Sequence, residues 1–201
     1  MTAKKKPARK TKRATPAGKT AVRAAKRAAK PARAPSAAYA DFMVQAYAME
    51  NDARDRYTEF AEQMDMHNNP DVARLFRKLA RIEGLHAETI VREMGWSKPP
   101  ARTEAWMWRH SEAPESAAPG DLHYLMQPYQ ALELALESER RAVSFFSGMT
   151  RSTAPVEVKR IAREMAAEER EHVRLIREWL KKFPKPERGW DQDPDPPQQS
   201  D

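Results

Sequence analysis

Apolar side chains recur with a helical period along most of the chain, from about residue 39 to residue 183. Four stretches carry such an apolar stripe: about 38–66, 70–94, 128–149, and a fourth that begins beside Pro155 and continues to Leu180. Asn69-Pro70 offers a cap and a first helical residue for the second stretch, and Gly95 offers its end. No stretch of any length alternates with the period of a strand, so the pattern predicts an all-α protein.

The lengths of the connections indicate how these helices are arranged. Short loops, 65–69 and 150–154, join the first helix to the second and the third to the fourth, whereas about 33 residues, 95–127, join the second to the third. This spacing predicts a four-helix bundle made of two hairpins with one long crossover. We expect four aromatic residues to hold the crossover against the bundle or against another subunit: Trp96, Trp106, Trp108 and Tyr124.

Each apolar stripe contains a glutamate, and two of them also contain a histidine. An ionised carboxylate is costly to bury without a partner. In Glu-x-x-His both side chains leave the same helix face and can bind one metal ion. The pattern Glu, then Glu-x-x-His, occurs twice, about 89 residues apart, and gives six candidate ligands: Glu50, Glu83, His86, Glu139, Glu169 and His172. Four carboxylates would neutralise two divalent ions, and this ligand set suits Fe or Mn and also binds Zn.

An ordinary bundle is the alternative interpretation. Its glutamates and histidines would be surface groups or salt-bridge partners of the nearby arginines Arg54, Arg140, Arg141 and Arg170. The acids Glu137, Glu168 and Glu171 fall off the apolar stripes and are expected on a solvated face. Three histidines in predicted loops lack a glutamate three residues before them and are interpreted as non-ligands: His67, His110 and His123.

Over residues 39–183 this order of motifs resembles the ferritin-like di-iron proteins, in particular the rubrerythrin and bacterioferritin branch. The resemblance implies two iron ions. It makes Glu50 and Glu139 terminal ligands, Glu83 and Glu169 bridging ligands, and His86 and His172 ligands of one iron each. It also implies that the hydroxyl of Tyr57 bonds a ligand carboxylate.

The chain departs from that family pattern at three points. Ala142 stands where rubrerythrins typically have an added glutamate, one turn after the ligand of the third helix. Asp52 stands where bacterioferritins have the methionine that binds haem. The chain has no cysteine, which excludes disulfides, thiolate metal sites and the cysteine-rich electron-transfer module usual in rubrerythrins.

Charge separates the ends of the chain from its middle. Residues 1–38 contain 13 Lys and Arg and no acid, residues 39–183 contain 21 bases and 24 acids, and residues 184–201 are rich in Pro and Asp. We expect a disordered basic arm (1–38), a bundle (39–183) and a disordered tail (184–201). The arm is either a solubilising tail or a binder of nucleic acid phosphates. It also looks like an organelle transit peptide, although its Lys-Lys-Lys start and its prolines argue against that.

No secretory signal and no apolar run long enough to span a membrane is found, so we expect a cytoplasmic protein, nucleoid-associated if the arm binds DNA. The primary hypothesis is a ferroxidase or peroxide-detoxifying protein that reduces O2 or peroxide while oxidising Fe(II), with an external electron donor. We expect a homo-oligomer, a dimer or larger. One alternative is an oxidase or hydroxylase of an organic substrate, for which Ala53, Gly84 and Ala142 could leave room; another is a non-catalytic nucleic-acid binder on a metal-stabilised bundle.

Overall fold

The computed structural model describes residues 35–101 and 114–193. It contains four long helices, α1 (Ala37–Met66), α2 (Pro70–Met94), α3 (Pro128–Arg151) and α4 (Val156–Leu180), and one 3-10 turn, η2 (Pro119–Asp121). All of them belong to one compact unit, Ala32–Asp201, and the described ranges contain no strand. The predicted all-α, ferritin-like four-helix bundle is confirmed. Predictions for residues 1–34, Trp106, Trp108, His110 and residues 194–201 lie outside the described residues.

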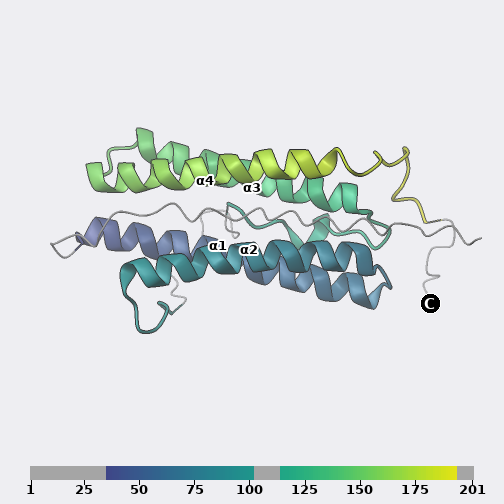
Figure 1. Cartoon of the computed structure of the whole chain (residues 1–201), viewed down its shortest axis with the longest axis horizontal. Helices are drawn as coiled ribbons and strands as arrows, with labels where there is room; N and C mark the ends of the chain where they lie inside the picture. Colours follow the sequence, from purple (N-terminus) through teal and green to yellow (C-terminus); the bar gives the residue numbers. More distant parts are fainter. Residues whose placement is uncertain (1–34, 102–113, 194–201) are drawn as a thin grey trace, which may run out of the picture. The chain divides into compact units, whose positions relative to one another are not determined.

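Two helical hairpins make up the bundle. Helix α1 packs along α2, and α3 packs along α4, while the crossover runs from the end of α2 to the start of α3 (Figure 1). Two apolar clusters join the hairpins. One contains Phe60 and Phe76 with Leu132, and the other contains Phe42 with Phe146 and Ile161. On every helix the predicted ligands lie between the segments that form the two clusters, so apolar packing encloses the site from both directions along the bundle.

The ends of α2 follow the sequence signals. The side chain of Asn69 accepts a hydrogen bond from the backbone N–H of Val72, and Gly95 adopts the left-handed conformation with φ of 64°. The third helix was predicted to end at about residue 149, next to Gly148, but α3 continues to Arg151. Gly148 is not among the described glycines with positive φ, and Ser152 ends the helix instead by donating a hydrogen bond from its hydroxyl to the Met149 carbonyl.

Aromatic contacts hold the described parts of the crossover. Trp96 packs edge-on against Tyr47 of α1, with ring centroids 6.0 Å apart. Tyr124 lies against the ring of His67 and donates a hydrogen bond to Asp193, so the beginning of the predicted tail also contacts the crossover. Both described residues of the predicted aromatic set therefore contact neighbouring elements, whereas the domain boundaries stay predictions.

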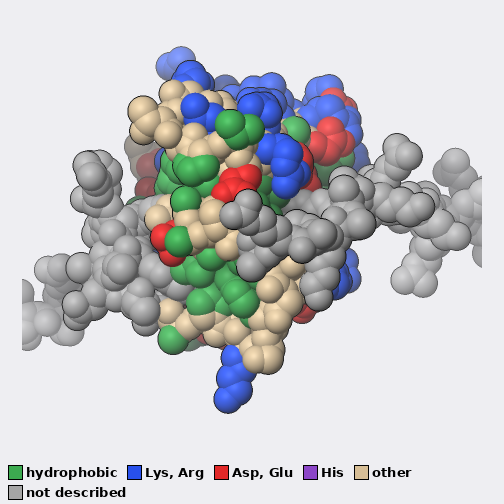
Figure 2. Space-filling view, turned by 90° about the vertical axis from the view of Figure 1, so that its left-hand side faces the viewer, with side chains coloured by type: hydrophobic (Ala, Val, Ile, Leu, Met, Phe, Trp, Pro, Cys, Tyr) green, Lys and Arg blue, Asp and Glu red, His purple; other side chains and the backbone are tan. Residues whose placement is uncertain are grey.

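At the bundle end where α1 and α4 begin, the two hairpins expose different kinds of side chain. Hydrophobic side chains occupy its middle, and Lys and Arg side chains gather above them over the α3–α4 hairpin (Figure 2). Arg151, at the end of α3, and Arg160, near the start of α4, are exposed. This basic surface belongs to a part of the chain that the sequence marks as mildly acidic overall.

Among the described helices, none combines the length and the hydropathy that crossing a membrane requires.

Asn69 has two roles that substitution should separate. It caps α2, and its amide donates a 2.6 Å hydrogen bond to the Met126 carbonyl at the end of the crossover. We expect Asn69→Ala to lower the free energy of unfolding by about 1–2 kcal/mol. Asn69→Asp keeps the cap but cannot donate to Met126, so it should lose less. Urea unfolding of both variants measures this, and equal losses would show that only one of the two contacts matters.

Candidate metal site

The first half of the site comes from the α1–α2 hairpin. Glu50 projects from α1, and Glu83 and His86 project from one face of α2. The Nδ1 atom of His86 lies 3.4 Å from Oε2 of Glu50 and 3.9 Å from Oε2 of Glu83. These three residues form one of the groups whose ligand atoms lie within 4.8 Å of one another and could hold a metal ion.

The second half repeats this arrangement in the α3–α4 hairpin. The Nδ1 atom of His172 lies 3.3 Å from Oε2 of Glu139 and 3.0 Å from Oε2 of Glu169. The two halves meet, because the imidazole rings of His86 and His172 stack with centroids 4.7 Å apart. His86, Glu169 and His172 form a second possible metal-binding group. All six predicted ligands are therefore gathered in one place.

Burial leaves the carboxylates of this site in need of cations. Glu83 is 0% exposed, and neither of its carboxyl oxygens has a hydrogen-bond partner. Glu169 is 1% exposed, and its Oε2 atom lies 3.0 Å from Nδ1 of His172. Such groups destabilise a fold by several kcal/mol unless a counter-charge reaches them. Carboxylate oxygens with imidazole nitrogens are donors that iron and manganese accept. The side chains present thus fit two metal ions, both in kind and in number.

The arginines that the alternative interpretation needs bind elsewhere. Arg54 pairs with Asp55, and Arg140 pairs with Glu137 at the surface. Arg170 donates a hydrogen bond to the hydroxyl of Ser147. The acids predicted to be solvated are exposed: Glu137, Glu168 and Glu171. Internal arginine salt bridges therefore do not account for the buried glutamates.

A fifth buried carboxylate, Glu115, was not predicted. It belongs to the crossover, is 1% exposed, and groups with Glu83 and Glu139 as a third set of possible metal ligands. Helical period predicts which residues lie in the interior, and residue 115 precedes α3 in a segment without such a period. The residues that follow it, Ser116 to Ala118, are small but carry no pattern that predicts burial.

Electrostatics within the cluster follow from burial and from proximity. Burial raises the pKa of Glu83 well above its usual value, and the neighbouring Glu139 raises it further. Burial likewise raises the pKa of Glu139 to about 7. For Glu169 burial acts in the same direction, but the hydrogen bond and positive charge of His172 outweigh it and lower the pKa. Without metal ions Glu83 thus holds a proton that a cation would displace, whereas Glu169 stays ionised beside His172.

The neighbouring carboxylates raise the pKa values of the two histidines. Burial favours the neutral ring of His86, but the charge of Glu50 outweighs it and raises the pKa of His86 to about 9. Hydrogen bonds to Glu139 and Glu169 raise the pKa of His172 well above its usual value in the same way. In metal-free protein at neutral pH, both imidazoles are therefore the counter-charges of the acids.

Tyr57 lies near the acids, but its hydroxyl is buried without a hydrogen-bond partner, so its predicted bond to a ligand carboxylate stays a prediction. Its ring is buried against Phe76, and burial together with the charges of Glu139 and Glu83 raises the pKa of its hydroxyl well above 10. The neutral hydroxyl can donate a hydrogen bond to a carboxylate. Two of the histidines interpreted as non-ligands, His67 and His123, lie in the described part of the chain. Both contact the ring of Tyr124.

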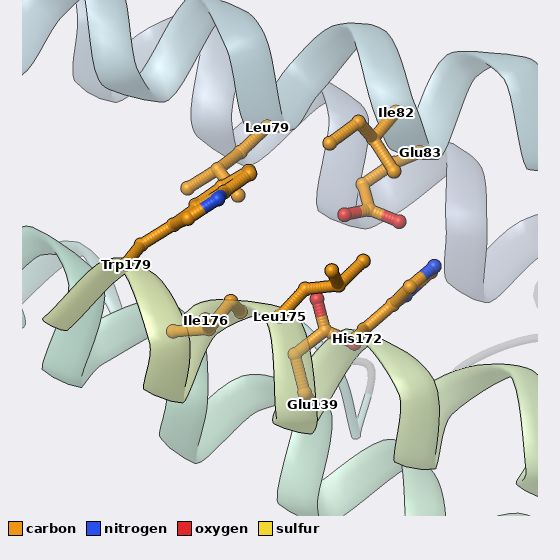
Figure 3. A pocket seen from close by; sticks show the side chains of 8 residues that line it. All are labelled: Leu79, Ile82, Glu83, Glu139, His172, Leu175, Ile176 and Trp179. Atoms are coloured by element: carbon orange, nitrogen blue, oxygen red, sulfur yellow. The ribbon is translucent and has the colours of Figure 1, made fainter. Parts of the chain in front are cut away.

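A small cavity opens beside the site between α2 and α4. Figure 3 shows the carboxyl groups of Glu83 and Glu139 directed toward each other across it, with His172 alongside. Its other walls are apolar, and its volume is about 20 Å³, which holds about one water-sized molecule. The lining residues are Leu79, Ile82, Glu83, Glu139, His172, Leu175, Ile176 and Trp179.

Two hairpins that enclose a buried carboxylate–histidine cluster define a ferritin-like protein of the di-iron class. A model of the rubrerythrin family matches residues 41–109 and 130–194. An uncharacterized conserved protein from Magnetospirillum magnetotacticum MS-1, known from a crystal structure, is 37% identical over 76% of this chain and 99% of its own, with a TM-score of 0.55. The functionally curated proteins contain no match. The chain belongs to the rubrerythrin family of ferritin-like di-iron proteins.

The buried acids should make metal-free protein sensitive to pH. Because the pKa of Glu83 is raised in the folded state, the folded chain keeps a proton that the unfolded chain releases above about pH 4.5. Stability therefore falls as the pH rises above that value, by at most about 1.4 kcal/mol per pH unit for one group. Glu83→Gln should flatten this fall and raise the free energy of unfolding at pH 7.5.

Chemical unfolding of the metal-free chain at pH 5 and pH 7.5 measures the effect. Glu88→Gln is the matched control, because Glu88 is an exposed glutamate of the same helix. A Glu83→Gln variant with the pH dependence of the unsubstituted chain would contradict the assignment of Glu83 as a buried, protonated acid.

Proposed function

We propose that this protein is a di-iron oxidoreductase that reduces O2 or peroxide while oxidising Fe(II). The observation that supports this most directly is the burial of two carboxyl groups, Glu83 and Glu169, beside two stacked histidines, with neither oxygen of Glu83 hydrogen-bonded. Membership of the rubrerythrin family supports iron as the metal.

Both hairpins would contribute ligands to the two iron ions. Glu50 and His86 would bind the first ion, Glu139 and His172 the second, and Glu83 and Glu169 would bridge them. When bound, the two iron ions would supply the electrons that reduce the oxidant. Tyr57 would hold a ligand carboxylate in position through its hydroxyl, since its raised pKa keeps that hydroxyl protonated.

The cavity between α2 and α4 favours a small oxidant. It admits a molecule of about the size of water, O2 or peroxide, and apart from the two glutamates and His172 its walls are apolar. Trp179 forms part of the wall, and the Nζ atom of Lys78 lies 3.5 Å from the centroid of its ring. This cation–π contact steadies the indole over the cavity.

Oxidation of an organic substrate has less support. The Arg54 side chain lies 3.3 Å from where a Cβ at Gly84 would be, and Ala53 and Ala142 are 1% and 0% exposed. The positions expected to leave room are therefore packed. The electron donor and the homo-oligomer stay predictions.

Iron loading tests the proposed function. Full-length metal-free protein, titrated anaerobically with Fe(II) and then exposed to O2 or peroxide, should bind two iron ions per chain and develop ferric absorbance. The double variant Glu50→Ala, Glu169→Ala should lose both properties, because one ligand disappears from each hairpin.

The matched control is Glu62→Ala, Glu168→Ala, which removes two exposed glutamates from the same two helices. It should behave like the unsubstituted chain. Retention of two rapidly oxidised iron ions by the Glu50, Glu169 double variant would overturn the proposal.

We also propose that the basic N-terminal arm binds nucleic acid, which rests on the 13 Lys and Arg and absence of acid in residues 1–38. Deleting residues 1–34 removes all 13 and spares Ser36, the cap of α1. Duplex DNA should bind the full chain with affinity that falls steeply with salt, and the deletion should abolish binding without changing Fe(II) oxidation. A chain lacking residues 194–201 is the control in gel-shift titrations, and equal binding by all three would refute the proposal.

A further inference from the structure

Glu115 is the buried ionisable group that the proposed function leaves unused. Both of its oxygens are buried without a hydrogen-bond partner, and 1% of the residue is exposed. An acid in that position needs a counter-charge or a proton. Within the described residues, one oxygen of each of Glu83, Glu115 and Glu139 lies within 4.8 Å of the other two.

The backbone on both sides of Glu115 is fixed by one arginine of α3. The Nε atom of Arg141 donates a 2.8 Å hydrogen bond to the Pro114 carbonyl, and its Nη2 atom donates a 3.1 Å hydrogen bond to the Ser116 carbonyl. Arg141 is also two residues from Glu139 on the same helix. This clamp holds the crossover against α3 and directs residue 115 inward.

We propose that Glu115 is a metal ligand, a fifth carboxylate supplied by the crossover, which binds one of the two metal ions together with Glu83 and Glu139. The inference rests on the proposed di-iron function and extends it. The two segments that match the rubrerythrin family end at residue 109 and resume at residue 130, so Glu115 lies outside them. Its assignment depends on its burial and on its position among the acids.

The competing explanation is that Glu115 is a protonated structural acid that stays in place when metal binds. Both explanations predict that Glu115→Gln stabilises the metal-free chain, because the amide is neutral. They differ in the metal-bound state, since only a ligand changes the affinity and the coordination of the metal.

Cobalt(II) is the probe, because its visible absorption reports coordination number without redox chemistry. Full-length metal-free protein should bind two Co(II) ions per chain. Glu115→Gln should weaken one of the two sites by about tenfold or more and intensify its visible bands, since loss of a ligand lowers the coordination number. Glu133→Gln, an exposed glutamate of α3, is the matched control and should change neither property.

A second variant tests the clamp. Lysine at position 141 cannot donate to both carbonyls at once, so Arg141→Lys should shift the cobalt spectrum in the same direction as Glu115→Gln and by a smaller amount. Two tightly bound Co(II) ions with an unchanged spectrum in Glu115→Gln would overturn this inference and leave the proposed function standing. Failure of the unsubstituted chain to bind Co(II) would overturn both.

Discussion

Buried negative charge is the constraint on which this structure depends. Five carboxyl groups and two imidazoles lie at mid-length in a bundle whose described interior is otherwise mainly apolar, and few of their atoms find hydrogen-bond partners. An arrangement of this kind is costly in free energy unless cations or protons balance it. The packing is otherwise ordinary, with aromatic and aliphatic clusters on both sides of the acids. The stability that those clusters provide allows the fold to tolerate carboxyl groups without hydrogen-bond partners when metal is absent.

The helical repeat is the reason so much could be predicted from sequence. Each ligand lies on a helix, and the phase of the apolar stripe selects Glu139 over the exposed Glu137 and Glu169 over the exposed Glu168. The same rule that buries a leucine therefore identifies a buried acid. The loops were as informative, because the two short connections and the one long connection allow few bundle topologies.

The remaining features depend on tertiary contacts that no local pattern encodes. Gly148 resembles a helix terminator, but in the bundle it stays helical and Ser152 ends α3. Glu115 lies in the crossover, where neighbouring positions have no periodic relation to the core. Its burial follows from the carbonyl contacts of Arg141, a residue that the sequence analysis considered only as a partner for carboxylates. One arginine thus has a structural role that its charge alone does not indicate.

The number of carboxylates affects which metal charge the site favours. Four ionised carboxylates balance two divalent ions, whereas a fifth leaves one negative charge in excess. That charge is better balanced when an ion is trivalent, and burial strengthens the effect because the low dielectric of the interior screens it little. The proposed oxidation of Fe(II) would gain from this bias, since the ferric product would be stabilised where it forms. Because Glu115 reaches the site from the crossover rather than from a helix of the bundle, the segment that joins the hairpins also contributes to the charge of the metal site.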